Sequence, residues 1–307
     1  MPDWLIERGI GETRAVLMED QEIIEARVLL DGQVAAGRLL AAKLKSVGRN
    51  AVAIAGGKEY LLPKGATGFT QGATLTIEVT REAIGVEGWK RPLARPAQGS
   101  PALTSAVAGR TLQFPSPADE LEQAGWSDLI EEARSAIVAF PGGELRIVVT
   151  PAMTLIDVDG AIPTADLAIA GARASASAIR RHGIGGSIGI DLPNADKAAR
   201  QAAVAAIDAI LPQPFERTAV NGFGFLQIVR PRRHASLFEL ALDRPSFEAR
   251  ALLRRAASET GRIELIAHPA VIAAVAPSWA EALARQIGGT VTLRPDPGLA
   301  MSAGHVH

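Results

Sequence analysis

Two aspartates, each at the end of an apolar stretch, are the side chains in this sequence best placed to do chemistry. Asp157 follows Leu155-Ile156, and Asp191 follows Ile188-Gly189-Ile190. Such runs are typical of buried strands, and a layered α/β fold binds its ligands beyond the carboxyl ends of its strands. Converging carboxylates make an oxygen-ligand site that suits Mg²⁺, which also binds substrate phosphates. We expect a metal there; the alternative is that both aspartates only cap turns, as Asp-Gly and Asp-Leu-Pro sequences do.

A third carboxylate, Asp159, shares a strand face with Asp157 if the strand stays extended through Val158. Other metal chemistry is excluded more directly. The sequence contains no cysteine, and its five histidines form neither H-x-x-x-H nor H-E-x-x-H, so the common zinc motifs are missing. The G-x-G at Gly183–Gly185 precedes a strand instead of following one, which excludes a dinucleotide-binding loop. P-loop and nucleophile-elbow motifs are also absent from the sequence.

Arginines follow a third apolar run. Arg230 ends this run, and Arg232 and Arg233 come directly after it. Guanidinium groups at this point would suit phosphate oxygens. They lie at the same strand end as the aspartates only if this strand runs parallel to the two strands that carry them. The alternative is a solvated strand exit with no role in binding.

The chain of 307 residues contains segments that differ in their pattern of apolar, polar and turn-forming residues, and these segments must position the groups above. Residues 1–36 alternate apolar and polar positions, as strands do. Residues 37–84 contain short Val-, Ile- and Leu-rich runs separated by turns, which predicts a small β-barrel. Residues 92–118 hold five prolines and indicate a linker. Strand and helix patterns then alternate, which indicates a layered α/β domain, and a small α/β unit follows from Ser246.

The predicted barrel is locally basic. Between Asp31 and Pro96 the sequence has ten Lys or Arg residues against five Asp or Glu. This excess of positive charge suits a barrel that binds an oligonucleotide, and a β-module with a solvated basic face is the equally open alternative. The net charge of the whole chain is −1, so bulk charge alone does not hold nucleic acid.

The sequence also bears on membranes and on location. No stretch of about 18 apolar residues lacks charges or breakers, so we expect no transmembrane helix. The first residues, MPDWLIERGIGETR, contain no apolar h-region and predict no signal peptide. We therefore expect a cytoplasmic protein without a membrane partner.

Three sequence blocks resemble, in order, those of the ribonuclease E/G family. The blocks are FPGGELRIVVTP (140–151) running into LIDVD (155–159), GGSIGID (185–191) and FGFLQIVRPR (223–232). Three ordered blocks are more specific than any one of them. The resemblance is good over residues 120–240, weaker over 241–307 and plausible over 1–96.

The resemblance implies an α/β (α+β multi-domain) fold. Ribonuclease-H-like strands are split by an inserted S1-like, or OB-like, β-barrel; a DNase-I-like layered α/β catalytic domain and a small C-terminal α/β domain follow. The implied boundaries are 1–36 for the N-terminal strands, 37–96 for the barrel, 97–150 for the linker and the rest of the ribonuclease-H-like domain, 151–235 for the catalytic domain and 236–307 for the small domain.

For function, the resemblance implies a Mg²⁺-dependent endoribonuclease that cleaves single-stranded RNA with metal-activated water. Mn²⁺ is the alternative ion. Asp157 and Asp191 would hold the metal, and Asp159 would assist in catalysis. The resemblance also assigns RNA binding to six side chains, with the tyrosine partly replacing the stacking aromatics that the barrel lacks: Arg217, Arg230, Arg232, Arg81, Lys43 and Tyr60.

This sequence departs from the family's pattern. Asp159 stands where the family has Asn, and Gln227 stands where it has Glu. The barrel passes straight into the proline-rich segment, which leaves no room for a 5′-sensor domain, so we expect no 5′-monophosphate preference. The Cys-Pro-x-Cys zinc link is replaced by Arg232-Arg233-His234-Ala235-Ser236, so any homo-oligomer would form without zinc. These departures keep a second hypothesis open: a non-catalytic, RNA-binding relative.

Overall fold

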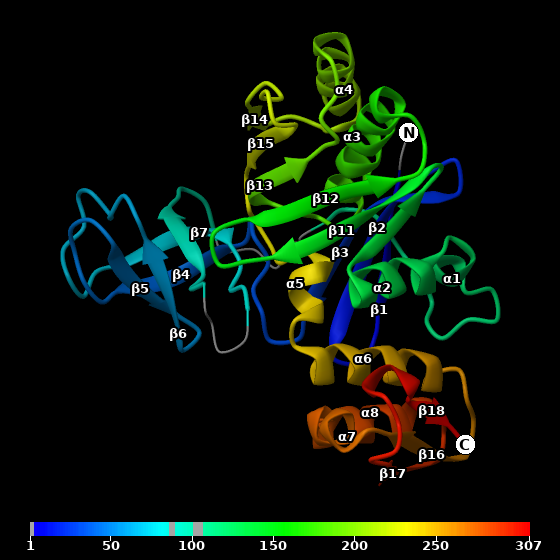
Figure 1. Cartoon of the computed structure of the whole chain (residues 1–307). Helices are drawn as coiled ribbons and strands as arrows, with labels where there is room; N and C mark the ends of the chain where they lie inside the picture. The colour runs from blue at the N-terminus through cyan, green and yellow to red at the C-terminus, as the bar shows by residue number, and fades with distance from the viewer. Residues whose placement is uncertain (1–2, 86–89, 101–106) are drawn as a thin grey trace.

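The computed structural model describes residues 3–85, 90–100 and 107–307. These residues form a mixed α/β molecule with three open sheets, one closed barrel and helices (Figure 1). Residues 86–89 of the expected barrel and 101–106 of the expected linker lie outside the described residues. The expected mixed α/β class with a small barrel is confirmed.

The first sheet is built around an antiparallel meander from the start of the chain. Its strand order is β3-β2-β1-β9, and the strands are β1 (Asp3–Arg8), β2 (Glu12–Glu19), β3 (Glu22–Leu30) and β9 (Arg110–Thr111). β9 pairs in parallel with β1. The barrel is therefore an insertion between β3 and β9 of one sheet.

The barrel closes in the order β4-β5-β6-β8-β7. Its strands are β4 (Leu39–Leu44), β5 (Ala51–Ala55), β6 (Lys58–Leu62), β7 (Thr74–Arg81) and β8 (Leu93–Pro96). Aliphatic side chains and one tyrosine fill the interior, among them Ala42, Ala53, Tyr60 and Ile77. Closure leaves no free strand edge, and the barrel has a hydrophobic core of its own.

The central sheet has the order β10-β11-β12-β13-β15-β14. Its strands are β10 (Ile137–Phe140), β11 (Gly143–Val149), β12 (Thr154–Gly160), β13 (Gly186–Asp191), β14 (Glu216–Arg217) and β15 (Phe225–Arg230). β12 and β13 are parallel, and the other neighbours are antiparallel. The expected boundary at residue 150 is wrong, because β10 and β11 pair with β12 across it.

Helices cover only one face of the central sheet. The crossover helix α3 (Thr164–Arg181) joins β12 to β13, and α4 (Lys197–Ile210) packs beside it. Gly171 lets α3 approach so closely that a Cβ at this position would clash with Val158. α3 also contacts β3, and the first and central sheets share one hydrophobic core. On the opposite face, Val148 and Val229 remain about half exposed.

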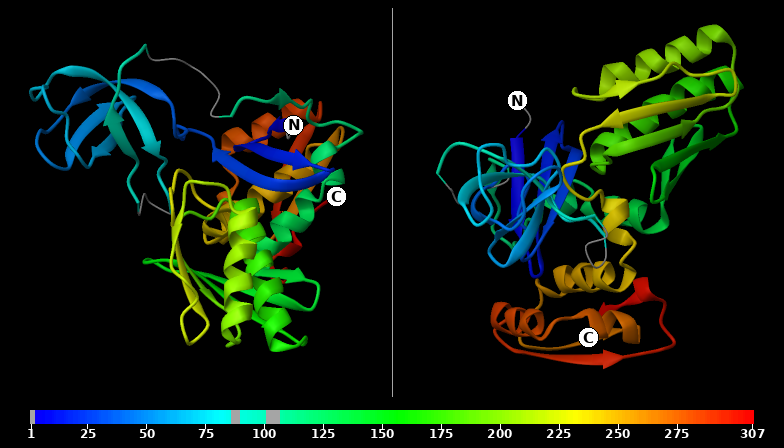
Figure 2. Two further views of the ribbon diagram at one scale, coloured as in Figure 1. Left: turned by 90° about the horizontal axis from the view of Figure 1, so that it is seen from above. Right: turned by 90° about the vertical axis from the view of Figure 1, so that its left-hand side faces the viewer.

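The remaining elements are α1 (Glu120–Gln123) and α2 (Trp126–Ser135) before the central sheet, and a C-terminal unit after it. That unit contains α5 (Leu237–Ala241), α6 (Arg244–Ala256), β16 (Arg262–Ala267), α7 (Pro269–Ala274), α8 (Pro277–Gln286), β17 (Thr290–Pro295), the 3₁₀ turn η2 (Met301–Ala303) and β18 (His305–Val306). It has a separate core, and it and the barrel lie at different ends of the molecule (Figure 2). Among the described residues, no helix is long and apolar enough to cross a membrane.

Buried ion pairs join α6 to the first sheet. Arg14 is 1% exposed and donates to Glu7 at 2.5 Å and to Glu12 at 2.7 Å. From α6, Arg250 donates to Glu12 at 2.9 Å, and Arg254 reaches Glu7 at 3.2 Å. Charges this deeply buried are stable only when each is paired and hydrogen-bonded. The network therefore fixes the C-terminal unit on the first sheet.

Replacing Arg14 tests how far the fold depends on this network. We expect Arg14→Met to lower the free energy of unfolding by about 3–5 kcal/mol, because Glu7 and Glu12 lose a buried counter-charge. Arg95→Met is the matched control, since Arg95 is 66% exposed in its pair with Glu78 and should change stability by less than about 1 kcal/mol. Urea denaturation of both variants measures the difference, and equal effects would contradict the assignment.

Candidate metal and RNA site

Asp157 and Asp191 lie side by side. Asp191 ends β13, whereas Asp157 lies inside β12, which continues to Gly160, so the expectation that both aspartates end their strands is wrong for Asp157. β12 and β13 run in parallel, and Asp157 and Asp191 are direct Cα partners in their register. Partners on adjacent strands project from the same face of a sheet. Asp159 lies two residues further along β12 and is also exposed, so the strand does stay extended through Val158. Three carboxylates thus project from the uncovered face of the central sheet.

Alternation along the two strands decides which side chains reach this face. Ile156 and Val158 of β12, and Ile188 and Ile190 of β13, are buried on the helix-covered side. The intervening positions point the other way. One of them is Gly189, where a Cβ would lie 2.6 Å from the Phe225 ring and 2.9 Å from Leu155. Phe225 itself is the Cα partner of Asp191 on β15, so an aromatic side chain borders the carboxylates.

The carboxylates repel one another. Partial burial raises the pKa of Asp157 above its usual value, and the charges of Asp159 and Asp191 raise it further, while Arg146 opposes the shift. Arg146 is the Cα partner of Asp157 on β11, and its Nε lies 3.9 Å from Asp159 Oδ2. It also donates to Glu144 at 2.5 Å, so one guanidinium is shared among several carboxylates.

This donor set fits a hard divalent cation. Mg²⁺ is commonly held by one or two protein carboxylates together with waters and substrate phosphates, and Asp157 and Asp191 supply two adjacent ones. The mutual repulsion that raises the pKa of Asp157 is the interaction that a cation would relieve. Among the described residues, no group of three or more His, Asp or Glu side chains is placed to hold a metal ion. A metal at this site would therefore rest on the two register partners Asp157 and Asp191, with waters and a phosphate as the further ligands that Mg²⁺ takes.

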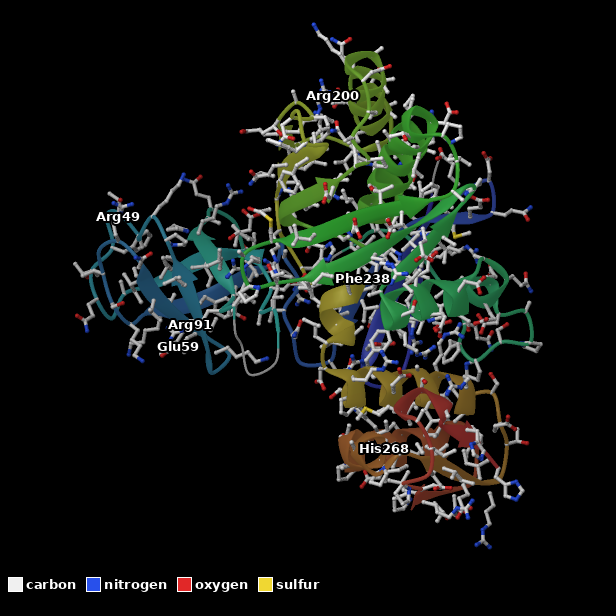
Figure 3. The ribbon with its side chains drawn as sticks, viewed as in Figure 1. Arg49, Glu59, Arg91, Arg200, Phe238 and His268 are labelled. Carbon is white, nitrogen blue, oxygen red and sulfur yellow. The ribbon has the colours of Figure 1, made fainter. Side chains whose placement is uncertain are left out.

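The surroundings of the carboxylates are open and partly aromatic. A hollow of about 480 Å³ lies beside them, lined by Arg146 and Asp159 among others. On the far side of Asp191, the loop before β15 carries Phe223, whose side chain is 86% exposed. Arg200 of α4 holds this loop through a 3.4 Å hydrogen bond to the Asn221 carbonyl, next to the strands of the site (Figure 3). Exposed rings of this kind are platforms for unstacked bases.

Three cations gather where the barrel meets the central sheet. Arg81 ends β7, Lys90 precedes β8 and Arg232 follows β15. Burial lowers the pKa of Lys90 and of Arg232, and the charge of Arg81 lowers both further. Arg81 donates to the Arg91 carbonyl at 2.7 Å, and Arg232 pairs with Glu239. Lys90 donates to the Pro151 carbonyl at 3.4 Å. This group, called the seam cluster below, brings together two of the sequence-predicted RNA-binding arginines.

Two other predicted arginines are not on the aspartate face. Arg217 is the Cα partner of the buried Ile228 and donates to Asp208 of α4 at 2.7 Å. Arg230 lies opposite Gly186, at the end of β13 remote from Asp191, because β15 runs antiparallel to β13. It donates to the carbonyls of Ile179 and Ile184 at the end of α3. The pairing direction therefore sets both arginines apart from the aspartates, and the prediction that they bind RNA stays a prediction.

The two barrel residues predicted to bind RNA, Tyr60 and Lys43, also differ in their exposure to solvent. Tyr60 was expected to stack on bases, but it is 2% exposed and fills the barrel interior, so this prediction is wrong. Its register partner is Ala53, and small neighbours leave room for the ring inside. Lys43 is exposed beside Ile54 on the outer surface. Arg49 and Arg91 are also basic residues of the barrel (Figure 3).

Sequence reasoning missed Arg146, Phe223 and Lys90. Arg146 alternates with buried Leu145 and Ile147, so its face could be read from the sequence, but not its register against Asp157. Phe223 begins the block FGFLQIVRPR (223–232), but its exposure depends on the conformation of the loop before β15. Lys90 joins the seam cluster only through tertiary packing.

Comparisons with known proteins do not place the chain in a family: no family model and no curated protein matches it.

The strain in the carboxylate group gives a stability prediction. A raised carboxyl pKa means that the folded state binds the proton more tightly than the unfolded chain, so ionised Asp157 lowers stability as the pH rises past the usual Asp pKa. We expect Asp157→Asn to raise the melting temperature at neutral pH in EDTA. If the carboxylates hold Mg²⁺, the ion should stabilise the wild type but not this variant, which lacks one of the two expected ligands. Asp31→Asn, in an exposed turn, is the control; a lower melting temperature for Asp157→Asn in EDTA would contradict the prediction.

Proposed function

We propose that this protein is a metal-dependent endoribonuclease acting on single-stranded RNA. The observation that carries the proposal is the parallel register that sets Asp157 beside Asp191 on an open sheet face. An uncovered sheet admits a long chain, whereas an enclosed pocket would admit only a small molecule. The resemblance to the ribonuclease E/G family in the sequence blocks around these aspartates supports the same reading.

The order of structural units also supports the proposal. A sheet interrupted by an inserted barrel, a layered unit with a parallel strand pair and a small C-terminal unit follow one another along the chain. We propose that they correspond to ribonuclease-H-like, S1-like, DNase-I-like and small domains. Against the expected boundaries, the layered unit begins with β10, and it shares its core with the first sheet.

A path for RNA runs from the barrel to the carboxylates. The seam cluster lies near the amino ends of β12 and β13, at Pro151 and Gly186. From the start of these strands, Asp157 lies three residues along β12 and Asp191 five residues along β13, or about 10–17 Å at 3.3 Å per residue. Arginine and lysine at one end would hold phosphates, and Phe223 and Phe225 at the other end would hold bases.

The chemistry proposed for the site is hydrolysis of a phosphodiester. Asp157 and Asp191 would hold Mg²⁺, or Mn²⁺ as the alternative, with Asp159 assisting. When bound, the ion neutralises phosphate charge and activates water. Arg146 would keep the Asp159 carboxylate in place. Phe225 would shield the Asp191 side from bulk water, and the aromatic rings would keep the strand single and splayed, because a paired helix buries its base faces.

The nuclease proposal is tested by cleavage of an unstructured, 5′-labelled A/U-rich RNA in Mg²⁺, Mn²⁺ or EDTA. We expect internal cuts with wild type and metal, and at least a hundredfold loss in the Asp157→Asn/Asp191→Asn variant, because two charged ligands of the ion are removed. Asp243→Asn is the matched control: Asp243 caps α6 of the C-terminal unit and Asn is an equivalent cap. Equal cleavage by wild type and the double variant would refute the assignment of these aspartates.

Phe223 provides a separate test of the RNA path. Because its ring is 86% exposed, Phe223→Ala should leave the melting temperature unchanged. We expect it to weaken binding of single-stranded RNA about tenfold, in line with 1–3 kcal/mol for one stacked base. Leu242→Ala, another exposed apolar side chain at 61%, is the control. Fluorescence anisotropy with a labelled RNA in EDTA measures binding without cleavage, and unchanged affinity in Phe223→Ala would remove the ring from the path.

The alternative is a non-catalytic RNA-binding protein. The observation that favours it is Gln227, a neutral amide in register with Gly189, one row from the aspartates where the family has a carboxylate. In that case the RNA stays intact in every metal, the Phe223→Ala effect persists, and the double aspartate variant binds RNA more tightly because negative charge is removed.

A further inference from the structure

A second cavity lies away from the carboxylates. It has a volume of about 320 Å³ and lies against the strands of the first sheet, where the chain enters the barrel, leaves it, and exits the central sheet. Four arginines from four different segments line it: Arg8, Arg27, Arg38 and Arg233. Glu82 is the one carboxylate among the lining residues.

Most of this positive charge is unbalanced. Arg27 pairs with Glu25 at 2.6 Å and stacks over the Trp4 ring at 4.8 Å. Within the described part of the chain, Arg8, Arg38 and Arg233 form no ion pair. The Nε of Arg38 is buried and has no hydrogen-bond partner among the residues that the structure describes. Buried polar groups without partners are rare, and several guanidinium groups facing one space are typical of phosphate recognition.

Glu82 is held in this cavity by the backbone on both sides. Its amide donates to the Arg233 carbonyl at 2.8 Å, and its Oε1 accepts from the Ala36 amide at 3.2 Å. Its exposed fraction is 7%, and burial raises the pKa of Glu82 to about 7, against the opposing charge of Arg27. Near neutral pH the carboxyl group is therefore partly protonated, and its O–H can donate to an anion.

The cavity also has an apolar wall. Ile6, Ala15 and Leu29, which share one face of the first sheet, lie among its lining residues. A site with an apolar wall and a cluster of guanidinium groups fits a ligand with a flat or apolar body and an anionic end. Its volume is at the lower end of the range for small-molecule pockets.

From these features we infer that this cavity is a binding site for a mononucleotide, with its phosphomonoester on Arg38 and Arg233 and its base against the apolar wall. The site is separate from the carboxylates on the open sheet, and it does not depend on the nuclease proposal. Neighbouring residues divide between the two: Arg81 and Arg232 belong to the seam cluster, while Glu82 and Arg233 line the cavity.

Binding is tested on the full chain by calorimetric titration with AMP, adenosine and inorganic phosphate at low salt. We expect AMP to bind, adenosine not to bind, and phosphate to bind more weakly. Arg38→Gln/Arg233→Gln should weaken AMP binding about tenfold or more, as loss of charge-assisted hydrogen bonds predicts, and Arg95→Gln should not. No AMP binding, or equal AMP binding by wild type and the double variant, would overturn the inference. Phosphate binding as tightly as AMP would remove the nucleotide part of it.

A second variant keeps the inference testable. If the double arginine variant does not fold, Glu82→Gln replaces it. That variant should bind AMP more tightly than wild type at about pH 8, where Glu82 is ionised, and equally at about pH 6. The other charged groups at the cavity are the four arginines, which keep their charge, and His234, whose pKa burial lowers to about 4. Equal binding by wild type and Glu82→Gln at both pH values would count against the site.

A competition experiment distinguishes the two possible sources of the phosphomonoester, which are the end of an RNA and a free mononucleotide. An oligoribonucleotide with a terminal phosphate that displaces AMP, while the same RNA without that phosphate does not, would identify the ligand as an RNA end. Failure of both RNAs to displace bound AMP would identify a free mononucleotide. Either result supports the phosphomonoester site, and displacement by both RNAs alike would overturn it.

Discussion

The parallel pairing of β12 with β13 is the constraint on which the candidate site depends. Parallel neighbours require a crossover connection, here α3, and both strands then end at the same edge of the sheet. Because Asp157 and Asp191 are register partners, their separation is set by the sheet and not by a loop. The two carboxylates repel each other, which contributes to the raised pKa of Asp157. They stay in register because the opposite face of both strands is buried under helices. The pair of carboxylates proposed to hold a cation is thus positioned by backbone pairing.

Different forces hold the different parts of the molecule. Apolar burial joins the first and central sheets into one core through α3, which makes the support of the carboxylates rigid. The C-terminal unit and the barrel have cores of their own. The former is attached through buried ion pairs centred on Arg14 and through Leu237, Phe238 and Phe247, which belong to the core of the first and central sheets. The latter meets the central sheet through cations and backbone hydrogen bonds such as that from Glu82 to Arg233. The seam cluster and the cavity proposed to bind a nucleotide both lie where the barrel meets the other sheets.

Much of the fold and the centre of the site could be predicted from the sequence. Alternation along Leu155–Asp159 is local information, and it predicted that Asp157 and Asp159 share a face. The strand–helix–strand pattern predicted that Asp191 joins them. The positions of Arg217 and Arg230 could not be predicted, because they depend on non-local strand pairing. β15 is antiparallel to β13, so Arg230 lies at the end of β13 remote from Asp191. Arg217 of β14 pairs with the buried Ile228 and so lies on the helix-covered side. Tyr60 failed because no local signal separates the inside of a barrel from its outside when the lining residues are alanines.

The insertion of the barrel within the first sheet orders the events of folding. β1, β2 and β3 are joined by tight turns, so their meander closes at low entropic cost. β9 contacts β1 only through the pairs Leu5–Arg110 and Ile6–Thr111, across a chain separation of about 105 residues. Contacts of such long sequence separation form late, and the barrel, complete in itself, has time to close before they do. The two ends of the closed barrel lie together, since Leu40 and Pro96 both pair with Ile77. Closure of the barrel therefore shortens the free chain that β9 must span to reach β1.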